Sequence, residues 1–118
     1  DTDFQPYLDT GVDCITAFEI FEHMLAPFNI LSKLKTPRLI ASVPLKLWFA
    51  TAYWNSNDDW DKHYHEFEQK QFDFLLDKSG WVVKDSLVWA SPDPKKIGVR
   101  PLLRYFIPRY YMVYCERV

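Results

Sequence analysis

Two short stretches of this sequence contain side chains that can bind a metal ion or move a proton. Glu19, Glu22 and His23 lie within five positions of one another, and His65 follows in a later stretch. Two carboxylates and two imidazoles could hold Mg²⁺ or Mn²⁺ against a hydroxyl group and lower the pKa of that hydroxyl. The alternative is a solvated turn in which Glu22 lies near a helix N-terminus and His23 makes a local hydrogen bond. Because short motifs often match by chance, we predict no metal and keep the four residues as an alternative metal set.

Two further groups of polar residues stand near His65. His63 and His65 flank Tyr64, and either imidazole could act as a base beside an acceptor. We favour the alternative, that both are surface histidines. Three acids are expected in a solvated loop, because nothing in the pattern fixes their geometry: Asp58, Asp59 and Asp61. The residues that we keep as catalytic candidates are Glu19, His23 and His65.

Composition limits the classes of protein to consider. The chain has 118 residues, enough for one small domain, and 48% of them are hydrophobic, so that it can form a core. Its net charge is −2, a balance that gives no support to a role in binding nucleic acid. Gly11, Gly80 and Gly98 are far apart, so the sequence contains no G-x-G loop for a nucleotide or phosphate.

Cysteine usage and hydropathy indicate the cellular compartment in which the protein is expected. Cys14 and Cys115 lie in apolar segments without a C-x-x-C pattern, so we expect two reduced, buried thiols. The first nine residues are acidic and polar and do not have the pattern of a signal peptide. The most apolar stretch, residues 47–54, is too short to cross a bilayer. We therefore expect a cytoplasmic protein without a transmembrane segment.

Hydrophobic patterning predicts alternating strands and helices. Four runs rich in β-branched or aromatic residues are expected to be strands: 12–18, 38–43, 81–89 and 110–115. One helix should follow Pro27 and end before Pro37, and a second should run from Glu66 to about Lys78 with Gly80 as its left-handed cap. This order predicts an α/β sheet with right-handed crossovers, closed by an antiparallel pair of strands.

Two connections between these elements could bind a ligand. Residues 45–64 are rich in tryptophan and form either a lid over an acceptor or a cover for the sheet, with some helix expected. Residues 94–115 contain no acid and five basic side chains: Lys95, Lys96, Arg100, Arg104 and Arg109. They could face an anionic or lipid-like acceptor, or a membrane surface. We favour the alternative of an arm that packs on the sheet with its charges outward.

Several of these motifs occur in a known order. The run VDCITAFEIFEH, residues 12–23, resembles the fourth strand and following E-x-x-E-H turn of class I S-adenosylmethionine-dependent methyltransferases. LIASVP, residues 39–44, is similar to the fifth strand of that family with its S-x-P ending, and residues 65–81 are similar to its late helix that ends in Gly-aromatic. The turn together with His65 also resembles the metal set of metal-dependent RNA 2′-O-methyltransferases. The resemblance covers nearly the whole chain.

The resemblance implies an incomplete Rossmann-like methyltransferase sheet. Residues 1–118 would be the C-terminal, acceptor-side half of the domain, with strands in the family order 4-5-7-6 and the last strand antiparallel. The first strands and the glycine loop would precede residue 1, so the isolated chain is expected to be inactive. The methyl donor S-adenosyl-L-methionine would contact four residues: Asp3, Phe4, Phe18 and Glu19.

Three functions follow as hypotheses. The first is part of a methyltransferase acting on a small-molecule or lipid-like acceptor. The second is a non-catalytic binding or dimerisation module derived from such an enzyme, and the third is the metal-dependent RNA enzyme. Because the strand at 12–18 would lack its usual neighbour, and exposed strand edges invite pairing with another chain, we also predict a homodimer.

Overall fold

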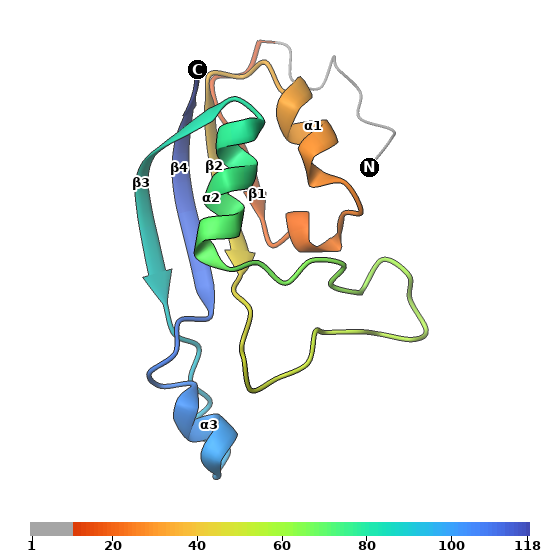
Figure 1. The fold of residues 1–118 in the computed structure, drawn as a ribbon, viewed down its shortest axis with the longest axis vertical. Coiled ribbons are helices and arrows are strands. Elements are labelled where there is room, and N and C mark those ends of the chain that lie inside the picture. Colours follow the sequence, from red (N-terminus) through yellow and green to blue (C-terminus); the bar gives the residue numbers. More distant parts are fainter. Residues whose placement is uncertain (1–10) are drawn as a thin grey trace.

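Short β-branched and aromatic runs form a single sheet in the computed structural model, which describes residues 11–118 (Figure 1). Its strands are β1 (Ile15–Phe18), β2 (Arg38–Pro44), β3 (Trp81–Trp89) and β4 (Tyr110–Arg117). Between them lie a 3-10 turn, η2 (Phe21–His23), and three helices, α1 (Pro27–Lys33), α2 (Gln69–Lys78) and α3 (Val99–Leu103). The predicted alternation of strands and helices is confirmed.

The four strands lie in the order β1-β2-β4-β3. β1 and β2 are parallel, with Phe18 opposite Ser42, whereas β4 runs antiparallel to both β2 and β3. The carboxyl ends of β1, β2 and β3 therefore meet at one edge of the sheet, the lower edge in Figure 1. This is the order predicted for the strands of the chain, with the last strand antiparallel.

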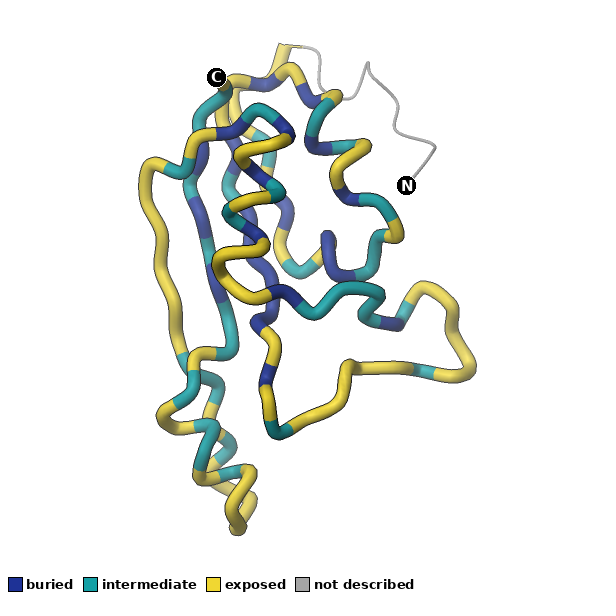
Figure 2. The backbone as a smooth tube through the Cα atoms, viewed as in Figure 1, coloured by how far each residue is buried: buried dark blue, intermediate teal, exposed yellow. Residues whose placement is uncertain are grey.

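The core lies between the sheet and the helices α1 and α2, which cover the same face (Figures 1 and 2). Alternate residues of β2 and β4 point into this core, as the pleat of a strand requires. Phe72 and Leu76 of α2 and Leu31 of α1 meet them and are fully buried. On the opposite face no helix among the described residues covers the sheet, and Ile40 and Leu87 line a shallow hollow there.

Local sequence explains where the helices begin and end. Pro27 occupies the first turn of α1, where its missing N–H costs nothing. Glu68 caps α2 through a capping box with Gln71, so this helix begins three residues later than the predicted Glu66. Gly80 ends α2 with a φ of 93°, which confirms the predicted left-handed cap.

The side chain of Arg117 fastens the ends of two helices to the sheet. Its guanidinium donates hydrogen bonds to the carbonyl oxygens of Leu31, Ser32 and Ser79 at 3.1, 2.9 and 3.0 Å. These carbonyls are the groups that a helix leaves unpaired at its C-terminal end. The guanidinium also lies 5.0 Å from the centre of the Trp81 ring. One residue of the last strand thus satisfies the ends of both α1 and α2.

The structure corrects the predicted first strand. Residues 12–18 were expected to be buried on both faces, but β1 spans four residues and only Ala17 in it is buried. The reason is its position, because β1 is an edge strand and one face of the sheet has no described helix over it. Cys14 is exposed for the same reason, so the expectation of two buried thiols is wrong for Cys14 and confirmed for Cys115.

The two long connections also differ from the predictions. Residues 45–64 contain no helix; they form an extended excursion with an isolated bridge between Trp54 and Lys62. Residues 94–109 contain the short helix α3, which was not predicted. Within residues 11–118, no helix is long and apolar enough to cross a membrane.

Candidate functional site

The turn that follows β1 stands at the carboxyl edge of the sheet. Glu19 has a φ of 54°, the one positive φ of a non-glycine residue in the described part of the chain. A left-handed residue of this kind costs about 1–2 kcal/mol, and such strain persists only where neighbours enforce it. Here the Glu19 N–H donates to the Ser42 carbonyl at 3.0 Å, and the Ser42 hydroxyl donates to Glu19 Oε2 at 3.2 Å. Phe18, directly before it, is 50% exposed and free to contact a ligand.

Charge on Glu19 is governed by its surroundings. Burial raises the pKa of its carboxyl group, while the Ser42 hydrogen bond and the positive charges of Arg109 and His23 oppose that rise. In open α/β sheets, ligands bind outside the carboxyl ends of the strands. The strained turn therefore places one carboxylate and one aromatic ring, Glu19 and Phe18, where such a ligand would lie.

Glu22 is an acid in the interior of the protein. It lies in η2, is 1% exposed, and its Oε2 has no hydrogen-bond partner. Burial, together with the nearby carboxylates of Glu19 and Glu66, raises the pKa of Glu22 to about 7. Its backbone carbonyl accepts hydrogen bonds from the N–H groups of Tyr64 and His65, so the long connection closes over it. The alternative of a solvated turn is wrong for this residue.

Two histidines face Glu22, and each has one ring nitrogen already occupied. His23 Nδ1 donates to the Lys62 carbonyl at 2.9 Å, which leaves Nε2 3.7 Å from Glu22 Oε1. His63 Nδ1 donates to Glu66 Oε1 at 3.2 Å, and its ring meets that of His23 edge-on at 4.8 Å. Burial lowers the pKa of His63, although the Glu66 carboxylate opposes this shift.

Glu22, His23 and His63 form a group that could hold a divalent cation. One ligand atom of each residue lies within 4.8 Å of those of the other two. Two imidazoles and one carboxylate are a common ligand set for zinc, and the outer contacts of both histidines match the supports that metal-bound imidazoles usually have. The unpaired Oε2 of Glu22 is a further buried group that a cation would satisfy.

This group differs from the metal set considered on sequence grounds. Of the four residues Glu19, Glu22, His23 and His65, the structure brings together Glu22 and His23 and adds His63. His65 instead donates from Nε2 to the Leu25 carbonyl at 3.0 Å and stacks on the Phe67 ring. The hydrogen bond of His23 is also not local, because its partner lies 39 positions along the chain.

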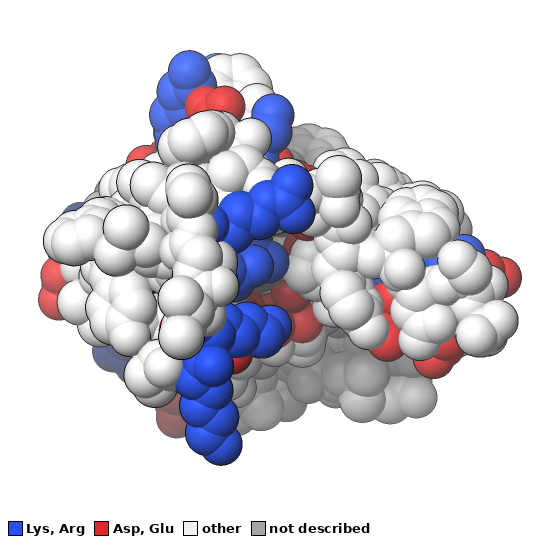
Figure 3. Space-filling view, turned by 90° about the horizontal axis from the view of Figure 1, so that it is seen from below, with Lys and Arg blue, Asp and Glu red and all other residues white. Residues whose placement is uncertain are grey.

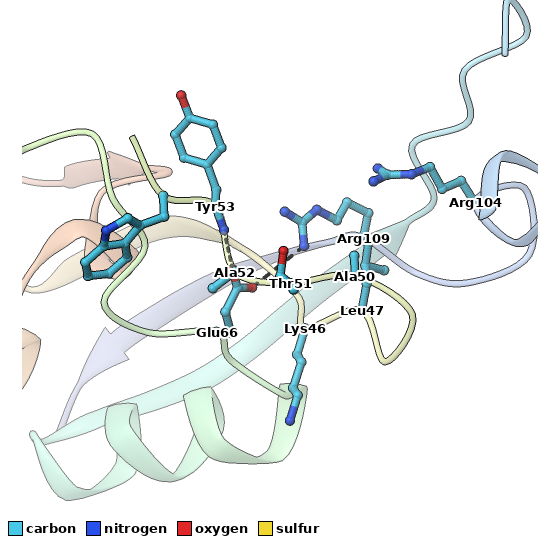
Figure 4. Close-up of a pocket in the computed structure, with 10 residues that line it drawn as sticks. Lys46, Leu47, Ala50, Thr51, Ala52, Tyr53, Glu66, Arg104 and Arg109 are labelled. Atoms are coloured by element: carbon cyan, nitrogen blue, oxygen red, sulfur yellow. Dashed lines mark hydrogen bonds and ion pairs between the residues drawn. The ribbon is translucent and has the colours of Figure 1, made fainter. Parts of the chain in front are cut away.

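A pocket of about 590 Å³ is lined in part by Glu66, the hydrogen-bond partner of His63 (Figure 4). Its walls come from residues 46–54 of the long connection, from Glu66, and from the connection between β3 and β4. Three of the lining side chains are cations, Lys46, Arg104 and Arg109, and Tyr53 and Trp54 add aromatic surface. Residues 45–64, for which the sequence left open a lid over an acceptor or a cover for the sheet, contribute most of the residues that line this pocket.

Glu66 joins the pocket to the histidine cluster. Its Oε1 accepts the hydrogen bond of His63 and a longer one from the Tyr53 N–H at 3.4 Å, and its Oε2 lies 3.8 Å from Arg109 Nη1. Arg109 also donates to the Leu45 carbonyl at 2.6 Å. Sequence reasoning missed Glu66, which it assigned to the start of a helix. The spacing His63-x-x-Glu66 was the signal that could have found it.

The acids of the long connection organise the loop itself. Asp61 Oδ2 accepts hydrogen bonds from the Tyr53 hydroxyl at 2.8 Å and the Asn55 amide at 3.0 Å. Asp59 pairs with Lys62 at 2.7 Å. These contacts lower the pKa values of both acids and fix their positions within the loop, whereas the sequence indicated no fixed geometry for them. Asp3 and Phe4, predicted to contact the donor, lie outside the described residues.

Comparison with known proteins relates this fold to methyltransferases. No family model matches the sequence, and no curated protein matches it. Among solved structures, a proposed S-adenosylmethionine-dependent methyltransferase from Listeria monocytogenes is similar with a TM-score of 0.61 and 12% identity, covering 90% of this chain and 61% of that one. A chain in the complex between the Haloferax volcanii Trm112 methyltransferase activator and a proposed methyltransferase has a TM-score of 0.62 and 14% identity, covering 99% of this chain and 57% of that one.

These similarities concern the fold, because both identities are low. The chain has a small α/β fold with a mixed four-stranded sheet that matches part of methyltransferase structures. It spans about three fifths of the length of each of the two proteins.

Proposed function

We propose that this chain is the acceptor-side part of an S-adenosylmethionine-dependent methyltransferase. The observation that carries the proposal is the placement of the strained Phe18–Glu19 turn and the 590 Å³ pocket at one edge of a methyltransferase-like sheet. In this proposal β1, β2, β3 and β4 correspond to strands 4, 5, 6 and 7 of that family. The E-x-x-E-H run is then the turn that separates the donor from the acceptor.

The protein takes little part in the covalent chemistry of methyl transfer. The acceptor oxygen attacks the methyl carbon of the sulfonium, the carbon–sulfur bond breaks, and sulfur keeps the electron pair as a neutral thioether. The protein must hold the two reactants in line and accept the proton of the acceptor hydroxyl. We assign Phe18 and Glu19 to the donor side, together with Asp3 and Phe4, and the pocket to the acceptor.

A carboxylate in the pocket wall can accept this proton. Glu66 lies in the pocket wall and accepts the Nδ1–H of His63, so its carboxylate can take the proton of an acceptor hydroxyl while the imidazole holds the carboxylate in place. Burial lowers the pKa of His63, which favours the neutral imidazole in this position. Glu19 and His23 stay catalytic candidates, and we place His63 in the role first given to His65, whose Nε2 is held by the Leu25 carbonyl.

The acceptor is proposed to be a small or lipid-like molecule with an oxygen nucleophile and an anionic group. Lys46, Arg104 and Arg109 line the pocket against a single carboxylate, that of Glu66, so a negatively charged ligand is favoured there. Aromatic Tyr53 and Trp54 offer surface to the uncharged part of such a molecule.

Donor binding tests this proposal. S-adenosylhomocysteine is titrated calorimetrically into the longest natural chain that contains residues 1–118, and Phe18→Ala is compared with Phe28→Ala, which removes an exposed ring from α1. We expect binding that Phe18→Ala weakens at least tenfold and that Phe28→Ala leaves unchanged. Equal binding by both variants would remove Phe18 from the donor site, and no binding by the natural protein would favour a binding or dimerisation module.

A metal-dependent methyltransferase, such as an RNA 2′-O-methyltransferase, is a second candidate. The observation that favours it is the group Glu22, His23 and His63 around an unpaired carboxylate oxygen. A divalent cation there would supply Lewis acidity to an acceptor hydroxyl. Cobalt(II) absorption spectra test for the ion directly: His63→Ala should abolish the visible bands and His65→Ala should leave them, whereas featureless spectra in the unmodified protein would end this candidate.

Pairing of two chains through β1 remains a proposal on the same fold. β1 is an edge strand, and its outer edge has no partner among residues 11–118. Light scattering of the purified chain would show a dimer if this edge pairs, and a clean monomer would refute it.

A further inference from the structure

The connection between β3 and β4 stands apart from the body of the protein. We call residues 94–109, which include α3, the α3 arm; Figure 1 shows it extending from the lower end of the sheet, away from α1 and α2. No residue of the arm is buried. The prediction that these residues pack on the sheet is therefore wrong, because the arm leaves the sheet edge instead of folding back on it.

Large apolar side chains of the arm are exposed to solvent. Ile97 is 99% exposed, Val99 74% and Phe106 75%, and Leu102 is more than half exposed. Scattered apolar residues on a surface are ordinary, but four large apolar side chains exposed within ten positions are a concentration of the kind found at interaction sites. The helix α3 has only five residues, and its own packing does not account for these side chains.

The charged side chains within the arm itself have one sign. Residues 94–109 carry five Lys and Arg residues and no acid, in a chain whose net charge is −2. Figure 3, which looks onto this end of the molecule, shows Lys and Arg side chains in a row beside largely uncharged surface. Only Lys96 has an ion pair, a 3.8 Å contact to the exposed Asp93, among the cations at 95, 96, 100 and 104 in the described structure.

We propose that the α3 arm is a docking surface for an anionic lipid bilayer. Ile97, Val99 and Phe106 enter the boundary between headgroups and acyl chains, while Lys95, Lys96 and Arg100 lie against lipid phosphates. Apolar side chains flanked by basic ones are the composition of segments that lie in a membrane interface. Charge complementarity selects the occupant, since the cytoplasmic faces of membranes are anionic and attract basic segments.

Docking of this kind would also orient the pocket. Arg104 belongs to the arm and lines the pocket, and Arg109 at the end of the arm does the same. A lipid-like, anionic acceptor would then be reached from the bilayer itself. Bilayer docking is independent of the proposed methyl transfer, because it needs neither donor nor acceptor and is measured without them.

Vesicle flotation tests the docking surface. The complete chain is mixed with phosphatidylcholine vesicles with or without phosphatidylserine, and the bound fraction is measured at low and high salt. We expect binding only with phosphatidylserine and weakening by salt. Lys95→Gln with Lys96→Gln should lower the partition coefficient about 25-fold, because each basic residue near an anionic surface contributes about fivefold. Ile97→Ser with Phe106→Ser should lower it about tenfold or more.

Matched controls make the same kinds of substitution at exposed residues outside the arm. Lys33→Gln with Lys84→Gln neutralises two exposed lysines outside the arm, and Leu25→Ser removes an apolar side chain that is 68% exposed. Neither control should change the partition coefficient by more than about the fivefold that a single surface charge contributes. Circular dichroism establishes that each variant is folded.

Three results would overturn the proposal. The unmodified chain could fail to bind anionic vesicles, or the controls could weaken binding as much as the arm variants do. Light scattering could also show a dimer that dissociates in the variant Ile97→Ser with Phe106→Ser. The last result would mean that a second copy of the chain covers the arm.

Discussion

Replacing the buried acid Glu22 by glutamine should change how stability depends on pH. Glu22 is 1% exposed, and burial raises the pKa of its carboxyl group from 4.5 to about 7. The folded protein therefore binds the proton of Glu22 more tightly than the unfolded chain does. Glu22→Gln keeps the size of the side chain and stays neutral at every pH.

The sign follows from proton linkage. Below pH 4.5 the carboxyl group is protonated in both states and makes no difference; as pH rises towards 7, only the unfolded chain loses the proton, so the free energy of unfolding falls. A shift of this size corresponds to about 3 kcal/mol, at 1.4 kcal/mol per unit. The free energy of unfolding of Glu22→Gln, relative to the unmodified protein, should thus increase by about 3 kcal/mol between pH 4.5 and pH 8.

Urea unfolding across this pH range, with a chelator present, measures that difference directly. Comparing the two proteins cancels the contribution of His63, whose lowered pKa makes both less stable as pH falls. Asp77→Asn is the matched control, because it replaces a carboxylate that is 73% exposed instead of a buried one. If the difference in free energy of unfolding between Glu22→Gln and the unmodified protein does not change with pH, the carboxyl group of Glu22 is not buried and unpaired. A fall in the difference once chelator is omitted would show instead that a cation stabilises the charged form.

Three further predictions concern other parts of the structure. Arg117→Ala should lower the free energy of unfolding by about 2–3 kcal/mol because three helix-end carbonyls lose a charged donor, whereas Arg38→Ala at the exposed start of β2 should cost less than about 0.5 kcal/mol in the same urea titration. Gly80→Ala should cost about 1 kcal/mol by thermal unfolding, since its φ is 93° and a Cβ would lie 3.4 Å from Arg117 Nη1; no change would mean that the turn relaxes. Ellman's reagent should label Cys14 rapidly and Cys115 only on unfolding, because burial raises the pKa of the Cys115 thiol to about 12, and two fast thiols would contradict the buried position.

Elements with a clear residue pattern could be predicted from the sequence. β2 and β4 are runs of apolar and aromatic residues, Pro27 begins α1, Gly80 follows the end of α2 and Pro37 directly precedes β2, so local chemistry determined these elements. β1 could not be bounded in the same way. An apolar run indicates a strand, but its burial depends on neighbours that the run does not reveal.

The candidate site was harder to predict, because its members depend on tertiary contacts. Glu22 was expected in solvent, as most acids are, and only the closing of the long connection over η2 buries it. The choice between His63 and His65 is set by the backbone hydrogen bonds of Tyr64 and His65 to Glu22, which turn the loop and bring His63 to the cluster. Nothing in the spacing of two histidines on either side of one residue distinguishes them.

The claim that these residues form the acceptor side of a methyltransferase is tested most directly by donor binding. S-adenosylhomocysteine is titrated into residues 1–118 alone and into a longer natural chain that supplies a glycine loop. Because the 118 residues contain no G-x-G loop, we predict no heat of binding with the short chain and clear binding with the long one. Micromolar binding by residues 1–118 alone would contradict the account, since the donor site would then lie within this chain.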